Sequence, residues 1–178
     1  MDTILVPTDG SVAAEKALDL AFDLAEKHDA RIKVLHILLR DKEPDELLRL
    51  PELAAADTDM AEELAALAGK PETPHSAEEL MAQRGVPDRP VSEALLRAIG
   101  GHVLNRAALR AKARGVSAEA LPLGDGAAAE AIASTAVAED VDTIVMGTRG
   151  LRQIEAVAFG SVSQQVCRLV KCTCVAVH

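Results

Sequence analysis

Three glycines and two serines near the end of the chain have the types and spacing to bind an anion. Gly147 and Gly150 follow a short apolar run, and Gly160-Ser161-Val162-Ser163 opens a stretch with helical periodicity. Glycine tolerates positive φ and close approach of a ligand, and a helix N-terminus presents unpaired N–H groups to an anion. Ser161 and Ser163 add hydroxyl donors. The segment therefore predicts a nucleotide phosphate loop between a strand and a helix.

The elements that must position this loop follow from the apolar pattern. Five short, branched runs predict strands, and the stretches between them have the period of helices. This alternation favours a doubly wound five-stranded parallel sheet with helices on both faces, a Rossmann-like α/β fold. Ligands of such sheets bind where strands end. The expected strands are Ile4 to Val6, Ile32 to Leu38, Ser117 to Leu123, Thr143 to Met146 and Cys174 to Val177.

Besides the helix that begins after Gly160, three helices are expected between these strands. Ser11 is the expected N-cap of the first, whose apolar stripe runs from Ala14 to Ala25, and a second stripe runs from Ala129 to Val137. A longer helix is expected from about Val91 to Arg114. Because each glycine costs about 1 kcal/mol in a helix interior relative to alanine, we expect a kink or break at Gly100-Gly101.

Composition bounds the class of protein. At 178 residues and 49% apolar, the chain suits one domain, 1–178, with a sizeable core. Trp and Tyr are absent and the net charge is −9, which disfavours nucleic acid as a partner. The sequence contains no run of about 18 apolar residues, so membrane insertion is not expected. Since Met1 is followed at once by Asp2 and a strand, with no basic leader, we expect a cytoplasmic location.

Residues 41–90 differ from the rest of the chain. They contain 13 acidic and 5 basic residues and six of the eight prolines, and we interpret them as an acidic, Pro-rich helical insertion. Two short helices are expected in it, Met60 to Ala68 and Ala77 to Arg84. The insertion could be a solvated acidic cover, a docking surface for a protein partner, or a lid over a ligand.

Two motifs carry a resemblance to a known family. Gly147-x2-Gly150-x9-Gly160-Ser161 is similar to the ATP-binding signature of the universal stress protein family, and Val6-Pro7-Thr8-Asp9-Gly10-Ser11 resembles that family's first strand and turn. The likeness covers Thr3 to about Leu39 and about Val91 to Val177. It implies an adenine nucleotide alpha hydrolase-like fold that binds ATP, with Mg2+ carried by the phosphates.

The resemblance also implies roles for single residues. Asp9 would lie against the adenosine, the main chain near Ile37 would face the adenine, and Gly147 would let the chain pass close to the ribose. The phosphates would be held by the N–H groups of Gly150 and Gly160 and by the two serine hydroxyls. The full set of expected nucleotide-binding residues is Pro7, Thr8, Asp9, Ile37, Met146, Gly147, Arg149, Gly150, Gly160, Ser161, Val162 and Ser163.

Several other features leave alternatives open. Arg149 and Arg152 could neutralise phosphate charge or be solvated surface charges. The G-x-G-x-x-A pattern from Gly124 to Ala129 loosely matches a dinucleotide fingerprint, but it lies far from the first strand. Its Asp125 is therefore expected to cap the following helix. His36 is interpreted as a strand residue with a satisfied ring.

The end of the chain is the expected dimer seam. In the resembled family the final strand pairs with its mate across a two-fold axis, so Thr173 to Val177 predict a homodimer. Three cysteines, Cys167, Cys172 and Cys174, are clustered there. Their odd number favours thiols over a disulfide framework, and too few further ligands lie nearby for a structural metal.

The function expected from these features is a nucleotide-dependent regulatory or stress-response module. Nucleotide occupancy would order the loop from Thr148 to Phe159 and change a surface read by another protein. No catalytic residue is assigned, because the chain lacks a recognisable general base or phosphate-loop lysine. The alternatives are a slow ATPase or autophosphorylating enzyme, with Ser161 or Ser163 as acceptor, and a nucleotide-free interaction module.

Overall fold

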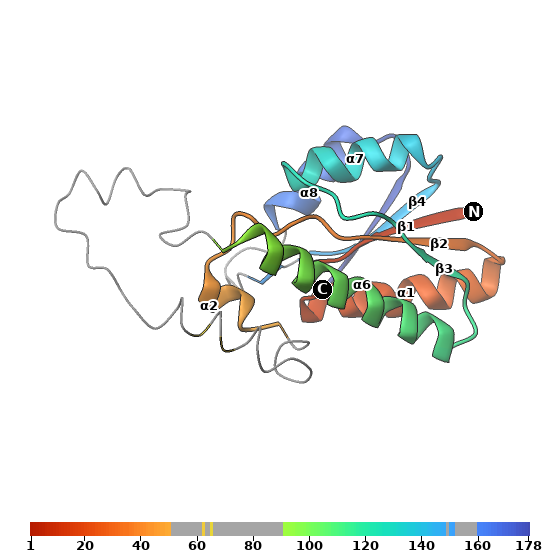
Figure 1. Ribbon diagram of the computed structural model, residues 1–178. Helices are drawn as coiled ribbons and strands as arrows, with labels where there is room; N and C mark the ends of the chain where they lie inside the picture. The colour runs from red at the N-terminus through yellow and green to blue at the C-terminus, as the bar shows by residue number, and fades with distance from the viewer. Residues whose placement is uncertain (51–61, 63–64, 66–90, 149, 152–159) are drawn as a thin grey trace.

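The computed structural model describes residues 1–50, 62, 65, 91–148, 150, 151 and 160–178. Strands and helices alternate along most of this part of the chain (Figure 1). In chain order the elements are β1 (Thr3–Pro7), α1 (Val12–His28), β2 (Arg31–Leu35), α2 (Pro44–Leu47), α6 (Glu93–Ala113), β3 (Ala118–Ala120), α7 (Ala128–Ala138), β4 (Thr143–Gly147), α8 (Ser161–Leu169) and β5 (Thr173–Val177).

The strands form one five-stranded parallel sheet in the order β3-β2-β1-β4-β5. This confirms the predicted α/β fold. The chain moves outward from β1 to β2 and β3, then returns to the other side of β1 with β4 and β5. The strand order therefore reverses between β1 and β4.

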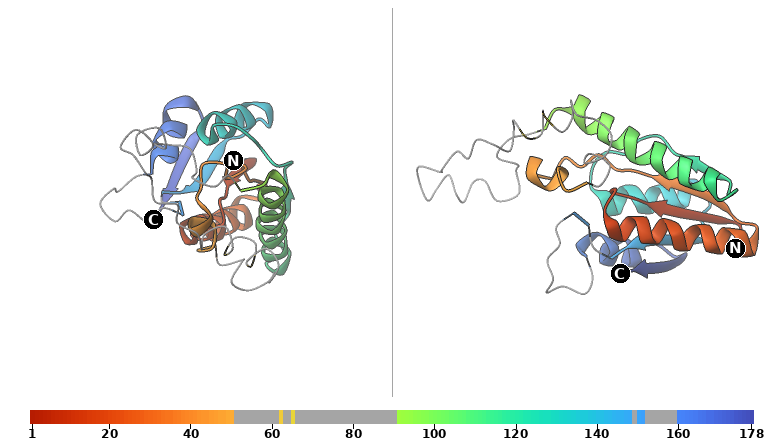
Figure 2. Two further views of the ribbon diagram at one scale, coloured as in Figure 1. Left: turned by 60° about the vertical axis from the view of Figure 1, so that its left-hand side comes forward. Right: turned by 90° about the horizontal axis from the view of Figure 1, so that it is seen from below.

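Alternate residues of the sheet pack against helices on opposite faces. Ile4 and Val6 of β1 lie in a buried cluster with α1 and α6, whereas Leu5 lies in a cluster with α7 and α8. The two helix layers are visible on either side of the sheet in Figures 1 and 2. A strand that is buried on both faces reads as a continuous apolar run, which is why β1 and β4 could be recognised from the sequence.

Helix α1 begins as predicted. The Ser11 hydroxyl accepts a hydrogen bond from the Ala14 N–H at 3.3 Å, and the helix ends at Asp29, which has a φ of 52°. Its polar side pairs with α6, where three arginines face acidic residues of α1. These ion pairs join Arg106 to Glu15, Arg110 to Glu15 and Asp19, and Arg114 to Asp23 and Glu26.

Helix α6 runs without a break from Glu93 to Ala113, so the predicted break at Gly100-Gly101 was wrong. The two glycines have different surroundings. A Cβ on Gly100 would lie 2.8 Å from the Cδ2 atom of the His36 ring, whereas a Cβ on Gly101 would have no atom within 4 Å. Gly100 is therefore a packing site for the buried imidazole, and packing compensates its helix cost.

Two strands are shorter than predicted. β2 ends at Leu35, although Ile37 still forms an isolated bridge with Gly124, and β3 spans only Ala118–Ala120. Pro122 has no N–H to donate to a sheet ladder, which accounts for the early end of β3. β2 loses regular pairing because β1 ends at Pro7, opposite Leu35.

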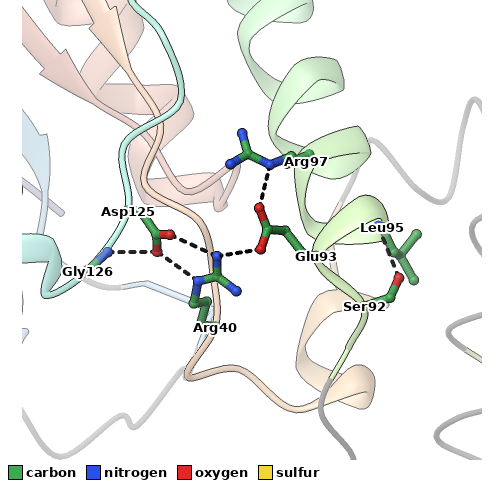
Figure 3. Close-up of polar contacts among 7 residues, drawn as sticks. All are labelled: Arg40, Ser92, Glu93, Leu95, Arg97, Asp125 and Gly126. Carbon is green, nitrogen blue, oxygen red and sulfur yellow. Dashed lines mark hydrogen bonds and ion pairs between the residues drawn. The ribbon is translucent and has the colours of Figure 1, made fainter.

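Asp125 does not cap α7, so the prediction that it caps this helix was wrong. The N-cap is Ala127, without a side-chain hydrogen bond. Asp125 instead accepts hydrogen bonds from the Arg40 guanidinium at 2.7 and 2.8 Å and from the Gly126 N–H at 2.8 Å (Figure 3). Together these hold the pKa of the Asp125 carboxyl at about 2, with the arginine contributing most.

The first ten residues of the predicted insertion are packed against the domain. Leu47 and Leu50 are fully buried in a cluster with α6. The remainder, including the helices expected at Met60 to Ala68 and Ala77 to Arg84, lies outside the described residues apart from 62 and 65.

The cysteines at the end of the chain are free. Cys172 and Cys174 both pack against the cluster beneath α7 and α8. Burial raises the pKa of the Cys174 thiol to about 12. Among the described residues, no group of three or more His, Cys, Asp or Glu side chains could hold a metal ion.

No helix in the described ranges is both long enough and apolar enough to cross a membrane.

Candidate functional site

The two motifs singled out in the sequence meet at one edge of the sheet. Thr8 and Asp9 follow β1, and Thr148 and Gly150 follow β4. β1 and β4 are neighbours, with Ile4 opposite Thr143. Because the strand order reverses between them, their connections leave in opposite directions at the carboxyl ends, and such a switch point is where doubly wound sheets bind ligands.

The turn after β1 is fixed by its own hydrogen bonds. The Thr8 N–H donates to the Leu35 carbonyl at 2.9 Å, and the Thr8 hydroxyl accepts from the Gly10 N–H at 3.2 Å. Asp9 Oδ1 accepts from the Ser11 N–H at 3.0 Å. Gly10 has a φ of 78°, a left-handed conformation that glycine adopts without cost. The Asp9 carboxylate is therefore held at the mouth of the switch point.

Gly150 lies directly against this carboxylate. A Cβ on Gly150 would be 2.8 Å from Asp9 Oδ2, the oxygen that Ser11 does not bind. A larger residue would displace the carboxylate or the loop. The structure thus brings together Asp9 and Gly150, which are 141 positions apart in the sequence.

Gly147 has a structural reason to be glycine. A Cβ there would lie 2.8 Å from the Ala13 carbonyl carbon and 2.9 Å from the Ala14 nitrogen, both in the first turn of α1. These are backbone atoms of a packed helix and cannot move aside easily. The bare Cα of Gly147 therefore faces α1, and the expected approach of this residue to a ribose stays a prediction.

Gly160 closes the loop onto its own beginning. Its N–H donates to the Thr148 carbonyl at 2.6 Å, so the expectation that this N–H points toward a ligand is not met. The Ser163 hydroxyl, which is buried, donates to the Gly160 carbonyl at 2.9 Å. Two of the four predicted phosphate donors are thus engaged within the chain.

The N-terminus of α8 supplies other donors. Its N-cap, Gly160, makes no side-chain capping bond. Within the described part of the chain, the N–H groups of Ser161, Val162 and Ser163 have no hydrogen-bond acceptor, as expected for the first turn of a helix. N–H groups of this kind, together with the partial positive charge of the helix end, are able to bind an anion. Ser161 and Val162 are also exposed.

Ile37 presents its main chain to the same edge. The carbonyl of His36 accepts from the Gly124 N–H at 2.8 Å, and the Leu38 N–H donates to the Gly124 carbonyl at 3.0 Å. Since N–H and C=O groups alternate sides along a strand, those of Ile37 point away from Gly124, toward the turn after β1. This orientation suits recognition of a planar heterocycle by main-chain groups. The Met146 side chain, in contrast, is buried in the core cluster beneath α7 and α8.

His36 supports the site from below, a role that the sequence did not indicate. Its side chain is fully buried, and Nδ1 lies 2.9 Å from the Thr8 carbonyl. Burial lowers the pKa of His36, so the ring is neutral and Nδ1 carries the proton that is donated. Nε2 has no hydrogen-bond partner among the described residues, so the expected satisfied ring is only half satisfied.

Thr148 was also missed. Its hydroxyl donates to the Val177 carbonyl at 3.1 Å and lies 2.8 Å from His178 Nδ1, while its N–H donates to the same Val177 carbonyl at 2.8 Å. Because the hydroxyl proton of Thr148 is donated to the Val177 carbonyl, the hydroxyl oxygen must accept a hydrogen bond from Nδ1 of His178. The beginning of the loop is therefore fixed to the end of β5. No signal in the sequence pairs these distant residues.

The remaining predicted site residues differ in what the structure describes. Pro7 is the last residue of β1 and is buried. Arg149 and Arg152 lie outside the described residues, so their expected phosphate contacts stay predictions.

Comparisons with known proteins agree with this fold. A model described as the universal stress protein family matches residues 1–178. No match was found among curated proteins.

Three solved structures illustrate the likeness. A universal stress protein family member from Burkholderia pseudomallei has 22% identity and a TM-score of 0.57, covering 99% of this chain and 95% of its own. A universal stress protein in complex with cAMP has 26% identity and a TM-score of 0.56, covering 99% and 97%. A family protein from Arabidopsis thaliana with AMP bound has 16% identity and a TM-score of 0.57, covering 99% and 91%.

Proposed function

The chain belongs to the universal stress protein family, and from this premise we propose that it binds an adenine nucleotide, in the first place ATP, and acts as a nucleotide-dependent regulatory module. The observation that carries the proposal is the meeting of Gly150 and Asp9 at the switch point between β1 and β4. The nucleotides named with two of the similar structures, AMP and cAMP, support adenine as the base.

The described residues suggest how each part of the nucleotide would be held. The outward-facing main chain of Ile37 suits the adenine edge, and Asp9 Oδ2 suits a ribose hydroxyl, because a carboxylate accepts such hydrogen bonds. The first-turn N–H groups of α8 suit the phosphates. Mg2+ would arrive with the phosphates, because no metal-binding group of side chains is present among the described residues.

Calorimetric titration tests this proposal. The purified protein is titrated with ATP, ADP, AMP and cAMP, with and without Mg2+, after acid extraction has removed and identified any nucleotide that co-purified. We expect saturable binding of at least one of the four, weakened at least tenfold by Asp9→Ala. Glu130→Ala, which removes an exposed carboxylate from α7, is the matched control and should leave affinity unchanged. A flat titration of the extracted protein with all four nucleotides would refute nucleotide binding.

We further propose a homodimer that pairs through β5. This strand lies at the edge of the sheet and its side chains are mostly half-buried. The Thr173 N–H donates to the Asp142 carbonyl, and the Val177 carbonyl accepts from Thr148, so the odd-numbered residues bond inward. By alternation, the main-chain groups of Cys174 and Ala176 face outward and are available to a second copy. A cytoplasmic location remains part of the same proposal.

A further inference from the structure

Leu151 connects the nucleotide site to the base of the insertion. It directly follows Gly150, which lies against Asp9, yet its own side chain is only 4% exposed. Leu151 belongs to a buried cluster that contains no residue of β1, β4 or α1. The other buried members of that cluster are Leu38, Leu39, Leu47, Leu50, Leu95, Leu96, Ile99 and Val103.

The insertion supplies a well-packed part of this cluster. Helix α2 starts with a capping box, in which the Glu43 N–H donates to the Glu46 side chain at 3.0 Å, and Pro44 occupies its first turn. Leu47 and Leu50 follow with 0% exposure. Burial of these leucines is favourable only while the cluster remains closed. Among the described residues, Leu151 is the one member contributed by the phosphate loop.

An ionic cluster holds the frame around these leucines. Arg40, just before the insertion, donates to Glu93 at 3.1 Å and to Asp125 at 2.7 Å, and Glu93 also accepts from Arg97 at 2.8 Å (Figure 3). The start of the insertion, the start of α6 and the turn before α7 are thereby joined. The wall on which Leu151 packs is therefore fixed on three elements.

We infer that Leu151 is a positioning residue that couples nucleotide binding to the packing of the insertion base, Pro44–Leu50. This rests on the proposed function. Leu151 and Gly150 are consecutive, so burial of one fixes the position of the other beside Asp9. Coupling of this kind is reciprocal: closure of the cluster favours the binding-competent loop, and a bound phosphate favours closure.

Truncation variants with a matched control test the inference. Leu151→Ala and Leu47→Ala each remove side-chain volume from the cluster, on the loop side and on the insertion side. Leu104→Ala removes the same atoms from α6 in the separate cluster beneath α1. If truncation reduces the anchored loop to about a tenth of the population, apparent affinity falls about tenfold. We expect such a loss for Leu151→Ala and Leu47→Ala, and less than a twofold change for Leu104→Ala.

Amide hydrogen exchange provides a readout that needs no ligand. Leu47→Ala should speed exchange at Thr148 and Gly160, whose N–H groups donate to backbone carbonyls at the two ends of the loop, in the nucleotide-free protein, and Leu104→Ala should not. If Leu151→Ala fails to fold, Leu47→Ala carries the affinity test, and Leu151→Met should retain near-normal binding.

The outcomes separate this inference from the proposed function. Absence of nucleotide binding by the unaltered protein defeats the proposed function, while the exchange measurement still decides whether the anchor exists. Normal affinity of Leu47→Ala and Leu151→Ala, or an equal loss in Leu104→Ala, overturns the coupling. Unaltered exchange at Thr148 and Gly160 in Leu47→Ala overturns the anchor itself.

Discussion

Replacing Gly100 with alanine should destabilise the protein, although alanine is the better helix former. The new Cβ would lie 2.7 Å from Leu123 Cδ2 and 2.8 Å from His36 Cδ2. The leucine methyl is the end of a flexible, partly exposed side chain and can rotate. The imidazole cannot, because it is fully buried and hydrogen-bonded to the Thr8 carbonyl. The immobile His36 ring is therefore the reason that Gly100→Ala should lower the stability and not raise it.

The neighbouring Gly101 serves as the reference from which the stability cost of Gly100→Ala is worked out. Gly101→Ala gains about 1 kcal/mol of helix propensity and meets no atom within 4 Å, so it should stabilise by about that amount. Gly100→Ala has the same gain but must overpack the core, which costs about 1–3 kcal/mol. The difference between the two variants isolates the overpacking term, and at about 2–4 °C per kcal/mol the melting temperatures should differ by roughly 2–12 °C.

Thermal and urea unfolding of both variants, followed by circular dichroism at pH 7.5, measure this difference. In a His36→Ala background, Gly100→Ala should cost much less stability than it does in the unaltered protein, because the new methyl then enters the space that the ring vacates. Equal stability of Gly100→Ala and Gly101→Ala would show that His36 can move aside and that the stated packing role of Gly100 is incorrect.

Three further outcomes are expected. Asp125 has a pKa of about 2 beside Arg40, so its folded pKa is depressed and its contribution to stability, complete above about pH 4, is lost as the pH falls toward 2. Asp125→Asn should therefore be less stable than the unaltered protein at pH 6 and equal to it near pH 2 by urea titration. Ala176→Pro removes an outward N–H of β5 without breaking a bond to β4, so sedimentation should show a folded monomer; a dimer would contradict the proposed seam. Iodoacetamide should alkylate exposed Cys167 before Cys174, whose pKa of about 12 leaves little thiolate, as peptide mapping would reveal.

The fold was predictable because its main signals are local. β1 and β4 are continuous apolar runs, and the stripe of α1 begins directly after the capping residue Ser11. The parallel arrangement of the strands follows from the helical crossovers that such alternation requires, whereas the strand order β3-β2-β1-β4-β5 was not predicted. The meeting of Asp9 with Gly150 could be expected too, since both residues come just after strands.

The predictions that were wrong concern residues whose roles depend on contacts with distant parts of the chain. Asp125 looks like a helix cap in its local sequence, but Arg40 offers a stronger charged partner from 85 positions away. Gly100 looks like a helix breaker, and only the position of His36 explains it. Leu151 was expected on a ligand-facing loop, whereas the cluster that buries it includes residues more than 100 positions earlier in the chain.

The three glycines of the loop no longer carry equal weight as indicators of a ligand. A Cβ on Gly147 would strike the backbone of α1, and a Cβ on Gly160 would lie 2.5 Å from the Thr148 carbonyl oxygen. Both glycines are therefore required by packing within the chain, whether or not a nucleotide binds. Gly150 alone has its open side toward a carboxylate at the switch point, with an anchored leucine behind it. In the proposed site we therefore expect Gly150 to be the glycine that the nucleotide requires, while the other two glycines bring the end of β4 and the beginning of α8 close enough to frame it.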